Sequence, residues 1–402
     1  MERVGPGICS RILLMAPQPV YQDRGTPIAV SLVAEALCEL GVEVDLLTYP
    51  IGEDLEFPGL SITRGSNPLG ISEVPIGFSL RKVYLNLCLL PSFLSLLRKG
   101  TYDAIIAVEE AVYLSLLVGK RLGIPVVYDM QSCIPDELAR HPVLGSSPAQ
   151  ALLRRIERWA LKGASAVVCS SGLRDYVENR TAKGAVSEWH FPVRERPVAA
   201  SEVAAIRRDL EIPEGALLIV YTGNDAPNQG IVRLIEAAAL VHERIPNAML
   251  LLAGLPRSSP YLQTPTGRQL ETAGILKVLE RQPRKKIYAI LEAAQVLVSP
   301  RASGRNVPLK IFDYLATGKP IVATGDFHRQ VLREDCAILV EPTSSSLAEG
   351  IVRALEDDDL VRVIGKNALE FAERELGWDT FRERVGKVVN STTRESAGAG
   401  GN

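Results

Sequence analysis

The sequence predicts an α/β protein that consists of two doubly wound domains, and three observations support this. The chain has 402 residues, which is too many for one ordinary hydrophobic core and suits two domains of roughly 190 residues each. An apolar strand, a loop and an amphipathic helix follow one another from Arg11, and the same order begins again at Leu217. Short connections between these alternating elements indicate parallel strands joined by right-handed crossovers.

The composition is that of a globular protein and argues against several kinds of site. Hydrophobic residues make up 47% of the chain and charged residues 23%, and the net charge is −2. A chain with this balance has no overall field that would recruit nucleic acid, so any anion site must be local. The six cysteines form no Cys-x-x-Cys pair, and the four histidines have no metal-ligand spacing. We therefore expect reduced thiols, no zinc or other metal site, and a cytoplasmic protein.

The first elements are typical of a doubly wound domain. Residues 11–16 form an apolar strand, residues 17–27 a loop that contains Gly25 and Thr26, and residues 28–40 a helix. In such domains ligands bind beyond the carboxyl ends of the strands. Gly25 and Thr26 are therefore candidates for close contact with a phosphate or a sugar, and an ordinary strand-to-helix turn is the alternative.

Strands and helices continue to alternate through the first half of the chain. The further elements that we expect there are 42–48, 104–108, 112–122, 126–128, 149–161 and 166–169. Asp129 and Gln131 follow the strand that ends at Tyr128, so they lie at the edge of the sheet where a ligand is expected. The amide of Gln131 can hydrogen-bond a ligand hydroxyl but takes no proton. Asp129 is either a second ligand group or the cap of its own loop.

The second half opens with the same order of elements. The strand 217–221 leads through a loop that contains Gly223 to a helix that starts after Gly230. Backbone N–H groups at the start of a helix attract phosphate, and glycine lets a ligand approach the backbone closely. This loop is therefore a candidate phosphate-binding loop.

Residues 299–324 concentrate hydrogen-bond donors between two strands. The donors are the side chains of Arg301, Ser303, Arg305, Asn306 and Lys310, together with the backbone around Val307. A helix begins with Pro308 in its first turn and ends before Gly318. A lysine beside a helix N-terminus opposes the helix dipole, so Lys310 suggests a bound anion such as phosphate. Asp313 follows on the same helix face and can accept hydrogen bonds from the hydroxyls of a ribose.

The same stretch resembles the C-terminal signature of the retaining glycosyltransferases of family 4. In that family a Glu-x₇-Glu pattern precedes a run of a small residue, Gly, Lys, Pro and hydrophobic residues. Residues 316–323 match the run, the second Glu falls on Asp313, and the first falls on Arg305. The resemblance implies a GT-B fold, in which two Rossmann-like doubly wound domains face each other across a cleft. It also implies transfer of a sugar from a nucleotide-sugar donor with retention of configuration.

The resemblance gives several candidates a role. Asp313 would hold the ribose of the donor, Gly254 would lie against the nucleotide, and Arg305 would contact the sugar or the diphosphate. Gln131 takes the place of a histidine that faces the donor sugar or the acceptor in the family. The implied donor is UDP- or GDP-linked, and no further cofactor is implied. No metal is needed, because fixed cations and dipoles can stabilise a departing phosphate.

Two cations of the family are replaced in this chain. Family members have an Arg after the first glycine of the phosphate-binding loop and a Lys before the second, where this chain has Asn224 and Gln229. The backbone at Asn224 can still contact a phosphate, but both charges are missing. We therefore expect neutralisation of the diphosphate to fall on Arg301, Arg305 and Lys310.

The resemblance also divides the chain. The stretch around residues 189–197 contains two prolines and breaks the periodicity, which is typical of an interdomain linker. We expect an acceptor-side domain at 1–193, a nucleotide-sugar-binding domain at 194–376, a helix at 377–392 that returns to the first domain, and a disordered tail at 393–402.

Two further segments each have two interpretations. Residues 81–99 are apolar with basic ends, which is typical either of a pair of covering helices or of a peripheral contact with the inner face of a membrane. The acidic run 356–359 resembles a metal site but is more typical of a solvated turn and a helix N-cap.

The sequence thus predicts a glycosyltransferase whose acceptor is a sugar, a lipid-linked molecule or a small molecule, in the synthesis of surface polysaccharide, glycolipid or glycoconjugate. The alternative is a non-catalytic nucleotide-sugar-binding or scaffold protein, because positions 131, 224, 229 and 305 depart from the family. A nucleotide-sugar epimerase of the same fold is a third option, but the acid/base groups expected of it are not apparent in the sequence.

Overall fold

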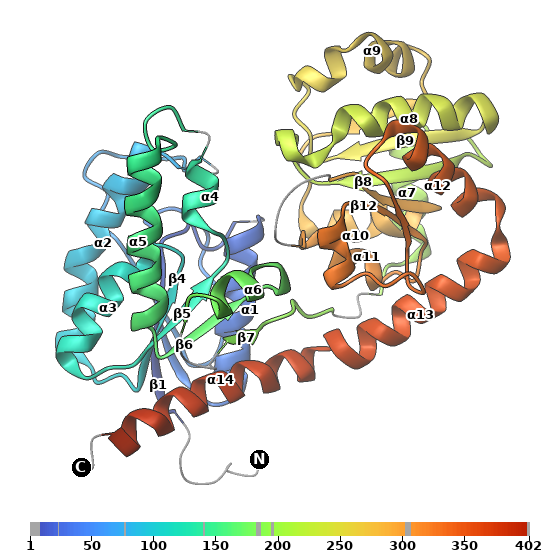
Figure 1. Cartoon of the computed structure of the whole chain (residues 1–402). Coiled ribbons are helices and arrows are strands. Elements are labelled where there is room, and N and C mark those ends of the chain that lie inside the picture. Colours follow the sequence, from blue (N-terminus) through green and yellow to red (C-terminus); the bar gives the residue numbers. More distant parts are fainter. Residues whose placement is uncertain are drawn as a thin grey trace. The chain divides into compact units, whose positions relative to one another are not determined.

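The computed structural model describes residues 9–22, 24–75, 78–139, 141–181, 186–193, 197–301 and 307–399. The chain divides into two compact units (Figure 1). Unit 1 comprises Met1–Phe191 and Asp379–Asn402, and unit 2 comprises Pro192–Trp378. The sequence had placed this boundary between residues 193 and 194. Each unit is a parallel sheet flanked by helices, so the chain has the predicted fold of two Rossmann-like domains.

Unit 1 contains a seven-stranded parallel sheet with the order β3-β2-β1-β4-β5-β6-β7. The strands are β1 (Arg11–Ala16), β2 (Glu43–Thr48), β3 (Leu60–Arg64), β4 (Ala104–Val108), β5 (Val126–Met130), β6 (Ala166–Cys169) and β7 (Val186–Glu188). The strand order reverses between β1 and β4, and both strands are buried almost throughout. Such continuous apolar strands are typical of a parallel sheet that is covered on both faces. The reversal marks the edge where ligands bind in sheets of this kind.

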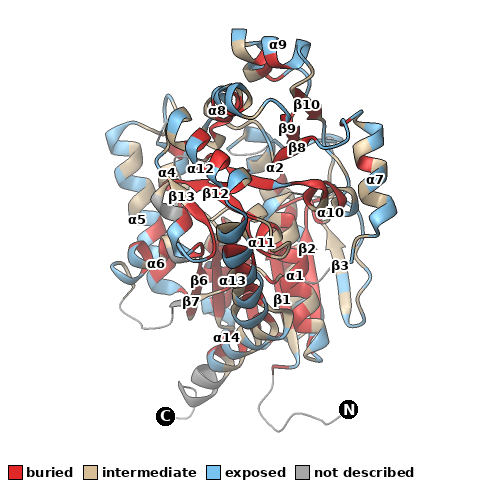
Figure 2. Ribbon diagram, turned by 90° about the vertical axis from the view of Figure 1, so that its right-hand side faces the viewer, coloured by how far each residue is buried: buried red, intermediate tan, exposed pale blue. Residues whose placement is uncertain are grey.

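The helices of unit 1 cover its sheet. They are α1 (Gly25–Glu39), α2 (Leu80–Lys99), α3 (Ala111–Leu122), α4 (Ile134–Leu138), α5 (Ser147–Gly163), α6 (Ser171–Glu178) and, from Asp379 onward, α14 (Trp378–Ala399). Buried residues of α2, α3 and α5 share one core cluster with Leu13, Ile105 and Tyr128 of the sheet. Helix α14 is fastened to α1 by an ion pair between Arg382 and Glu39 at 3.0 Å. Figure 2 shows the buried residues concentrated in the strands and on the sheet-facing sides of the helices.

Unit 2 contains a six-stranded parallel sheet with the order β10-β9-β8-β11-β12-β13. The strands are β8 (Leu217–Thr222), β9 (Ala248–Ala253), β10 (Leu276–Leu279), β11 (Val296–Ser299), β12 (Ile321–Thr324) and β13 (Ile338–Val340). The helices are α7 (Ala200–Asp209), η1 (Pro227–Gln229), α8 (Ile231–Arg244), η2 (Pro260–Gln263), α9 (Pro265–Thr272), α10 (Arg284–Ala293), α11 (Lys310–Leu315), η3 (Asp326–Gln330), α12 (Ser344–Glu356) and α13 (Asp358–Leu376). The strand order reverses between β8 and β11, so the loops after these strands lie where a ligand is expected.

Two helix starts differ from the sequence predictions. Helix α1 begins at Gly25, so Gly25 and Thr26 lie in its first turn and not in the preceding loop. Helix α11 begins at Lys310, two residues after Pro308, and it is only six residues long. The helix therefore begins later than predicted, and so short a helix contributes only a small dipole at its start.

Two longer segments also differ. The predicted pair of helices at 81–99 is one continuous helix, α2, that contains Pro91. The helix continues past the proline because Leu89 and Phe93 on either side of it are fully buried in the core of unit 1. The tail predicted to be disordered from residue 393 is helical as far as Ala399, because no proline interrupts the C-terminal helix.

Helix α2 is also the one helix in the described part of the chain that is long and apolar enough to cross a membrane. The most apolar 18 residues of this helix have a mean hydropathy of 1.3, and 17% of these residues are buried in the protein. Leu85, Leu89 and Phe93 nevertheless have no exposed surface and belong to the core of unit 1. Helix α2 is therefore an integral part of a folded helix layer.

Candidate functional site

Glycine-containing loops of unit 2 meet at the carboxyl ends of β8, β9 and β11. Gly223 follows β8 with φ +140°, Gly254 follows β9 with φ +107°, and Gly230 precedes α8 with φ +76°. A Cβ atom on Gly254 would lie 2.6 Å from the carbonyl oxygen of Gly223, and one on Gly230 would lie 2.1 Å from that of Pro300. Side chains do not fit at such distances, so these loops can approach each other only because the residues are glycines. Gly223 and Gly254, both site candidates, thus lie side by side.

The ammonium group of Lys310 lies among these loops. Its Nζ atom donates a hydrogen bond to Oε1 of Gln229 at 3.2 Å and lies 3.8 Å from the ring centroid of Tyr221. A Cβ atom on Gly223 would come within 2.7 Å of Nζ. The side chain of Lys310 therefore connects the loop after β11 to the loop after β8.

Lys310 has no counter-charge in the described part of the chain. No described carboxylate forms an ion pair with it, and residues 302–306 contain no acidic residue. Burial lowers the pKa of Lys310 well below its ordinary value, and the nearby Arg301 lowers it further. Burial also lowers the pKa of Arg301. The two side chains form a cationic site that an anion would complete.

Two buried tyrosines fix the loop after β8, and the sequence analysis did not single out either of them. The hydroxyl of Tyr221 donates to the carbonyl oxygen of Asn224 at 2.7 Å, and the hydroxyl of Tyr314 accepts from the backbone N–H of Thr222 at 2.9 Å. The side-chain oxygen of Asn224 accepts from the backbone N–H of Ala226 at 3.1 Å. The side-chain oxygen of Asn224 therefore caps its own loop.

Asp313 has a basic partner that the sequence analysis missed. Its carboxylate forms an ion pair with Arg284 at 3.1 Å, and both side chains are about a quarter exposed. Spacing along the helix had placed Lys310 and Asp313 on one face, but the two side chains have different partners. Its position could have identified Arg284 from the sequence, because this residue begins the helix that precedes β11.

The remaining candidates of unit 2 lie around the loop after β11. The carbonyl oxygen of Arg301 accepts a hydrogen bond from Oγ1 of Thr324 at 3.0 Å, which fixes the start of the loop. Val307 is partly exposed and precedes α11. The candidates Ser303, Arg305 and Asn306 lie outside the described residues.

In unit 1, polar side chains gather at the carboxyl ends of β4 and β5. The backbone N–H of Glu109 donates to the carbonyl oxygen of Asp129 at 3.0 Å, which joins the two strand ends. Oδ1 of Asp129 accepts from Nε2 of Gln131 at 2.7 Å, and Oε2 of Glu109 accepts from Oγ of Ser132 at 2.9 Å. Glu109 has φ +53°, a left-handed conformation that is uncommon outside glycine and frequent at functional sites.

These carboxyl groups bind protons more tightly than usual. Burial raises the pKa of Asp129 to about 7. Burial, followed by the charges of Glu137 and Glu110, raises the pKa of Glu109 well above its ordinary value. A protonated carboxyl group can donate a hydrogen bond, which a carboxylate cannot. Glu109 was not predicted, although it directly follows the buried strand β4. Asp129 was predicted because the strand before it was expected to end at Tyr128, whereas β5 continues to Met130 and includes Asp129.

The raised pKa of Asp129 makes the stability of unit 1 depend on pH. The folded state binds more protons than the unfolded state between the ordinary pKa of 3.8 and about 7. The free energy of unfolding should therefore fall as the pH rises through this interval and level off above it. Asp129→Asn removes the buried charge but adds amide hydrogens that need partners, so we expect unit 1 to gain about 1–2 kcal/mol at pH 8. Denaturant unfolding at pH 5 and pH 8 measures both effects.

Asp45 provides a matched control for this substitution. It is also a buried aspartate in the sheet of unit 1, but it forms an ion pair with Arg11 at 2.8 Å and accepts from the hydroxyl of Tyr102 at 2.7 Å. Asp45→Asn removes the charge that these partners require and should destabilise unit 1 at both pH values. Loss of stability at pH 8 in both variants would contradict the account of Asp129.

Gly25 and Thr26 occupy the first turn of α1 in unit 1. Gly25 is exposed and Thr26 is partly exposed. The N-cap residue Arg24 makes no side-chain cap, and its guanidinium donates instead to the carbonyl oxygen of Val74 at 3.0 Å. The first backbone N–H groups of α1 therefore donate no hydrogen bond to the side chain of their cap residue.

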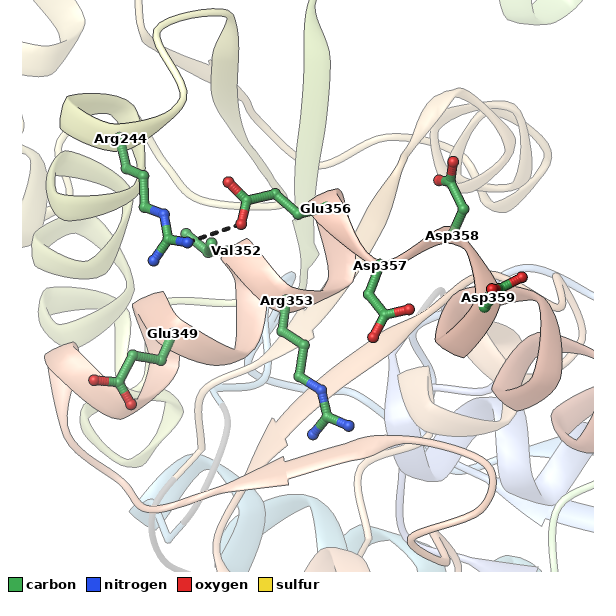
Figure 3. Close-up of a pocket in the computed structure, with 8 residues that line it drawn as sticks. All are labelled: Arg244, Glu349, Val352, Arg353, Glu356, Asp357, Asp358 and Asp359. Carbon is green, nitrogen blue, oxygen red and sulfur yellow. Dashed lines mark hydrogen bonds and ion pairs between the residues drawn. The ribbon is translucent and has the colours of Figure 1, made fainter.

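The acidic run 356–359 lines a hollow on the surface of unit 2, together with Arg244, Glu349, Val352 and Arg353 (Figure 3). Glu356 forms an ion pair with Arg244 at 2.9 Å, and Oδ1 of Asp357 accepts from the backbone N–H of Leu360 at 2.9 Å. The predicted N-cap is thus confirmed at Asp357. No group of three or more metal-binding side chains occurs in the part of the chain that the structure describes.

Two family profiles match the chain in sequence order. The profile described as "Glycosyl transferase 4-like domain" matches residues 24–185, and the one described as "Glycosyl transferases group 1" matches residues 202–371. The first profile lies in unit 1 and the second in unit 2. Together they cover most of the chain.

Several curated proteins are related to the chain at low identity. A D-inositol 3-phosphate glycosyltransferase of Corynebacterium efficiens is 28% identical over 203 residues, which cover 48% of this chain and 47% of that protein. The chain thus spans about half the length of this relative. A putative colanic acid biosynthesis glycosyl transferase of Escherichia coli is 26% identical over 381 residues, which cover 86% of this chain and 91% of that protein.

Solved structures share the fold of the whole chain. Sucrose-phosphate synthase from Thermosynechococcus elongatus superimposes with a TM-score of 0.76 at 21% identity, covering 96% of this chain and 100% of that one. Anabaena HepE in complex with UDP-glucose superimposes with a TM-score of 0.71 at 17% identity, covering 95% and 99%. From the two matching domain profiles and this shared fold, we conclude that the chain has the GT-B fold and contains a glycosyl transferase 4-like domain followed by a glycosyl transferases group 1 domain.

Proposed function

We propose that the protein transfers a sugar from a nucleoside-diphosphate-sugar donor to an acceptor hydroxyl, with retention of configuration and without a metal. The observation that carries this proposal is the position of Lys310. Its ammonium has no carboxylate partner among the residues that the structure describes, and it lies among the glycine loops at the carboxyl ends of β8 and β11. A diphosphate supplies the missing negative charge, and its small oxygens fit against backbone that carries no side chain.

Donor binding uses three parts of unit 2. Lys310 and Arg301 neutralise the diphosphate, and their charge stabilises it further as the bond to the sugar breaks. The amides that follow Gly230 at the start of α8, a helix of fourteen residues without a side-chain cap, donate to phosphate oxygens. Asp313 accepts hydrogen bonds from the ribose hydroxyls, and Arg284 holds its carboxylate in place.

The loop after β11 completes the donor site in this proposal. Ser303, Arg305 and Asn306 are assigned to it from the sequence, with Val307 contributing backbone. Arg305 is assigned to the diphosphate or the donor sugar. The complex of Anabaena HepE with UDP-glucose supports a UDP-linked donor, and a GDP-linked donor is the other candidate.

Unit 1 supplies the acceptor side. Asp129 and Gln131 already bond to each other, and between them they offer a carboxyl and an amide to sugar hydroxyls. Gly25 and Thr26, in the first turn of α1, provide close backbone contact. Acceptor classes that fit the relatives are a sugar, a phosphorylated small molecule or a lipid-linked molecule, in cytoplasmic synthesis of polysaccharide, glycolipid or glycoconjugate.

A second function has an observation in its favour. Asn224 and Gln229 replace two cations of the family, and the side chain of Asn224 caps its own loop. This arrangement suits a protein that binds a nucleotide sugar without transferring it. In this alternative the protein binds the donor at the same site but does not transfer the sugar.

A two-step experiment distinguishes these functions. First, the thermal midpoint of the full chain is measured with UDP-, GDP- and ADP-linked sugars, because a ligand of the native state raises it. Donors that bind are then incubated with candidate acceptors, and NMR assigns the anomer of any product. A retained anomer supports the transferase, and binding without transfer or hydrolysis supports the binding protein. Absence of any nucleotide effect would overturn both.

A further inference from the structure

A completely buried histidine lies close to the loop that follows β11. His328, in the short helix η3, has no exposed surface. Burial, with smaller contributions from the charges of Arg301 and Lys310, lowers the pKa of its imidazole to about 4. The ring is therefore neutral at physiological pH, and it lies near enough to the two cations of the candidate donor site to experience their charge.

The hydrogen-bond partners of His328 define which ring nitrogen carries the proton. Nδ1 lies 2.5 Å from the carbonyl oxygen of Thr324, and because a carbonyl oxygen can only accept, Nδ1 is the donor. In a neutral imidazole the other nitrogen is then an acceptor, so Nε2 accepts from the hydroxyl of Ser299 at 2.9 Å. Ser299 is the last residue of β11, and Thr324 is the last residue of β12. The ring thus joins the carboxyl ends of two neighbouring strands.

The hydrogen bonds continue from Thr324 into the loop after β11. Oγ1 of Thr324 donates to the carbonyl oxygen of Arg301 at 3.0 Å. Ser299 and Arg301 flank Pro300 in the sequence. The chain is therefore held on both sides of Pro300, by the imidazole on one side and by the threonine hydroxyl on the other.

The three polar side chains behind this loop need an explanation other than packing. His328, Ser299 and Thr324 are 0%, 0% and 1% exposed, and we call them the His328 network. Apolar side chains of similar size would fill the same space without polar groups to satisfy. A buried polar network whose members are all hydrogen-bonded instead specifies one arrangement of the groups that it joins. Here it specifies the position of the backbone at Arg301, from which the guanidinium extends.

From these contacts we infer that the His328 network is a positioning device, which holds the backbone of Arg301 where its guanidinium contacts the donor diphosphate. This role rests on the proposed function, in which Arg301 and Lys310 neutralise the diphosphate. A neutral imidazole suits the role, because an imidazolium would place a third positive charge beside these two cations. It would also leave the hydroxyl of Ser299 without a nitrogen lone pair to donate to.

The first test removes the bond between the network and the loop. Thr324→Val deletes the hydroxyl that donates to the loop, but it keeps the backbone carbonyl that accepts from the imidazole. Calorimetry of the full chain with UDP, GDP and ADP measures the affinity for nucleotides. The affinity should fall about tenfold, which is the size of one lost hydrogen bond. Thr324→Ser keeps a hydroxyl and should restore most of the affinity.

A double variant shows whether the effect passes through Arg301. Arg301→Met removes the guanidinium but keeps the backbone carbonyl that accepts from Thr324. Adding Thr324→Val to Arg301→Met should lower the affinity by less than about twofold more, because two changes in one chain of contacts are not additive. The loss of stability caused by Thr324→Val, measured by denaturant unfolding, should be the same in both backgrounds, because the lost bond is to the backbone.

Thr392→Val is the matched control. Thr392 is 2% exposed, and its hydroxyl also donates to a backbone carbonyl oxygen, that of Val388 at 2.8 Å. It lies in α14, in the part of this helix that belongs to unit 1. Thr392→Val should therefore lose stability and keep the nucleotide affinity of the wild type.

NMR of protein labelled with heavy nitrogen in its histidines tests the network in the wild type. The His328 ring, assigned with His328→Asn, should be neutral at pH 7 with its proton on Nδ1, and it should take up a second proton only below about pH 5. A proton on Nε2, or an imidazolium at pH 7, would overturn the inference whatever the variants do. So would equal nucleotide affinity in the wild type and Thr324→Val, or additive losses in the double variant. A wild type that binds none of the three nucleotides would overturn the proposed function as well.

Discussion

Lys310→Met is expected to reduce the affinity for nucleoside diphosphates on the order of 100-fold while the protein stays folded, because a hydrogen bond to a charged group contributes roughly 1.5–3 kcal/mol. The methionine keeps the contact with the ring of Tyr221 but cannot neutralise a phosphate. Because the lysine is partly exposed and has no carboxylate partner in the described chain, its removal should stabilise unit 2 slightly, by at most about 1 kcal/mol. Calorimetry with UDP and GDP and denaturant unfolding measure the two effects.

The same lysine should make donor binding depend on pH. Burial lowers the pKa of Lys310 in the folded protein, so the unfolded chain binds more protons between that lowered value and the ordinary value of 10.5. The free energy of unfolding should therefore rise with pH across this interval. A bound diphosphate stabilises the ammonium form and so raises the pKa of Lys310, and within that interval binding should take up protons and weaken as the pH rises. Calorimetry in buffers of different ionisation enthalpy detects this uptake, which should vanish in Lys310→Met.

Lys319 serves as the control. Burial lowers its pKa as well, but it lies 3.8 Å from the carboxylate of Glu292 and outside the glycine loops. Lys319→Met should leave nucleotide affinity and proton uptake unchanged. A folded Lys310→Met that still binds UDP and GDP normally would contradict the donor site.

Strand ends were the most predictable part of the site. Apolar runs identified β1 and β5 from the sequence, and the carboxyl-end rule then selected Gly25 and Thr26 after β1 and Asp129 and Gln131 at the end of β5. The rule would also have selected Glu109 after β4 if it had been applied to every strand. Local pattern therefore suffices to find the strand ends at which a ligand is expected in a doubly wound sheet.

Side-chain partners were not predictable in the same way. Helical spacing placed Lys310 and Asp313 on one face, but Tyr221 and Arg284 lie far from them in sequence and determine what each contacts. Helix α5 shows the same limit. Its periodicity identifies a stripe of apolar residues, but it does not tell whether this stripe faces the core. There the small Ala160 packs inward and the large Trp159 outward. Such choices depend on the space that neighbouring elements leave.

Gly230→Ala should destabilise unit 2 far more than Gly274→Ala, although both glycines have φ +76°. An alanine in this conformation costs about 1–2 kcal/mol at either position. At Gly274 the added methyl group would meet nothing within 4 Å, whereas at Gly230 it would lie 2.1 Å from the carbonyl oxygen of Pro300. We expect Gly230→Ala to cost about 2–3 kcal/mol more, because backbone must move to relieve the overlap.

The backbone movement in Gly230→Ala should also weaken nucleotide binding. This effect distinguishes a local packing defect from a general loss of stability. Relieving the overlap displaces the start of α8 from Pro300, and hence separates the loop amides from Arg301 and Lys310. Gly230→Ala should therefore lose nucleotide affinity at temperatures where hydrogen exchange shows β8 and β11 still protected, whereas Gly274→Ala should keep it. Equal unfolding costs for the two variants, measured by the denaturant midpoint of unit 2, would mean that the loops after β8 and β11 are not packed together. The diphosphate would then have no preformed site between them.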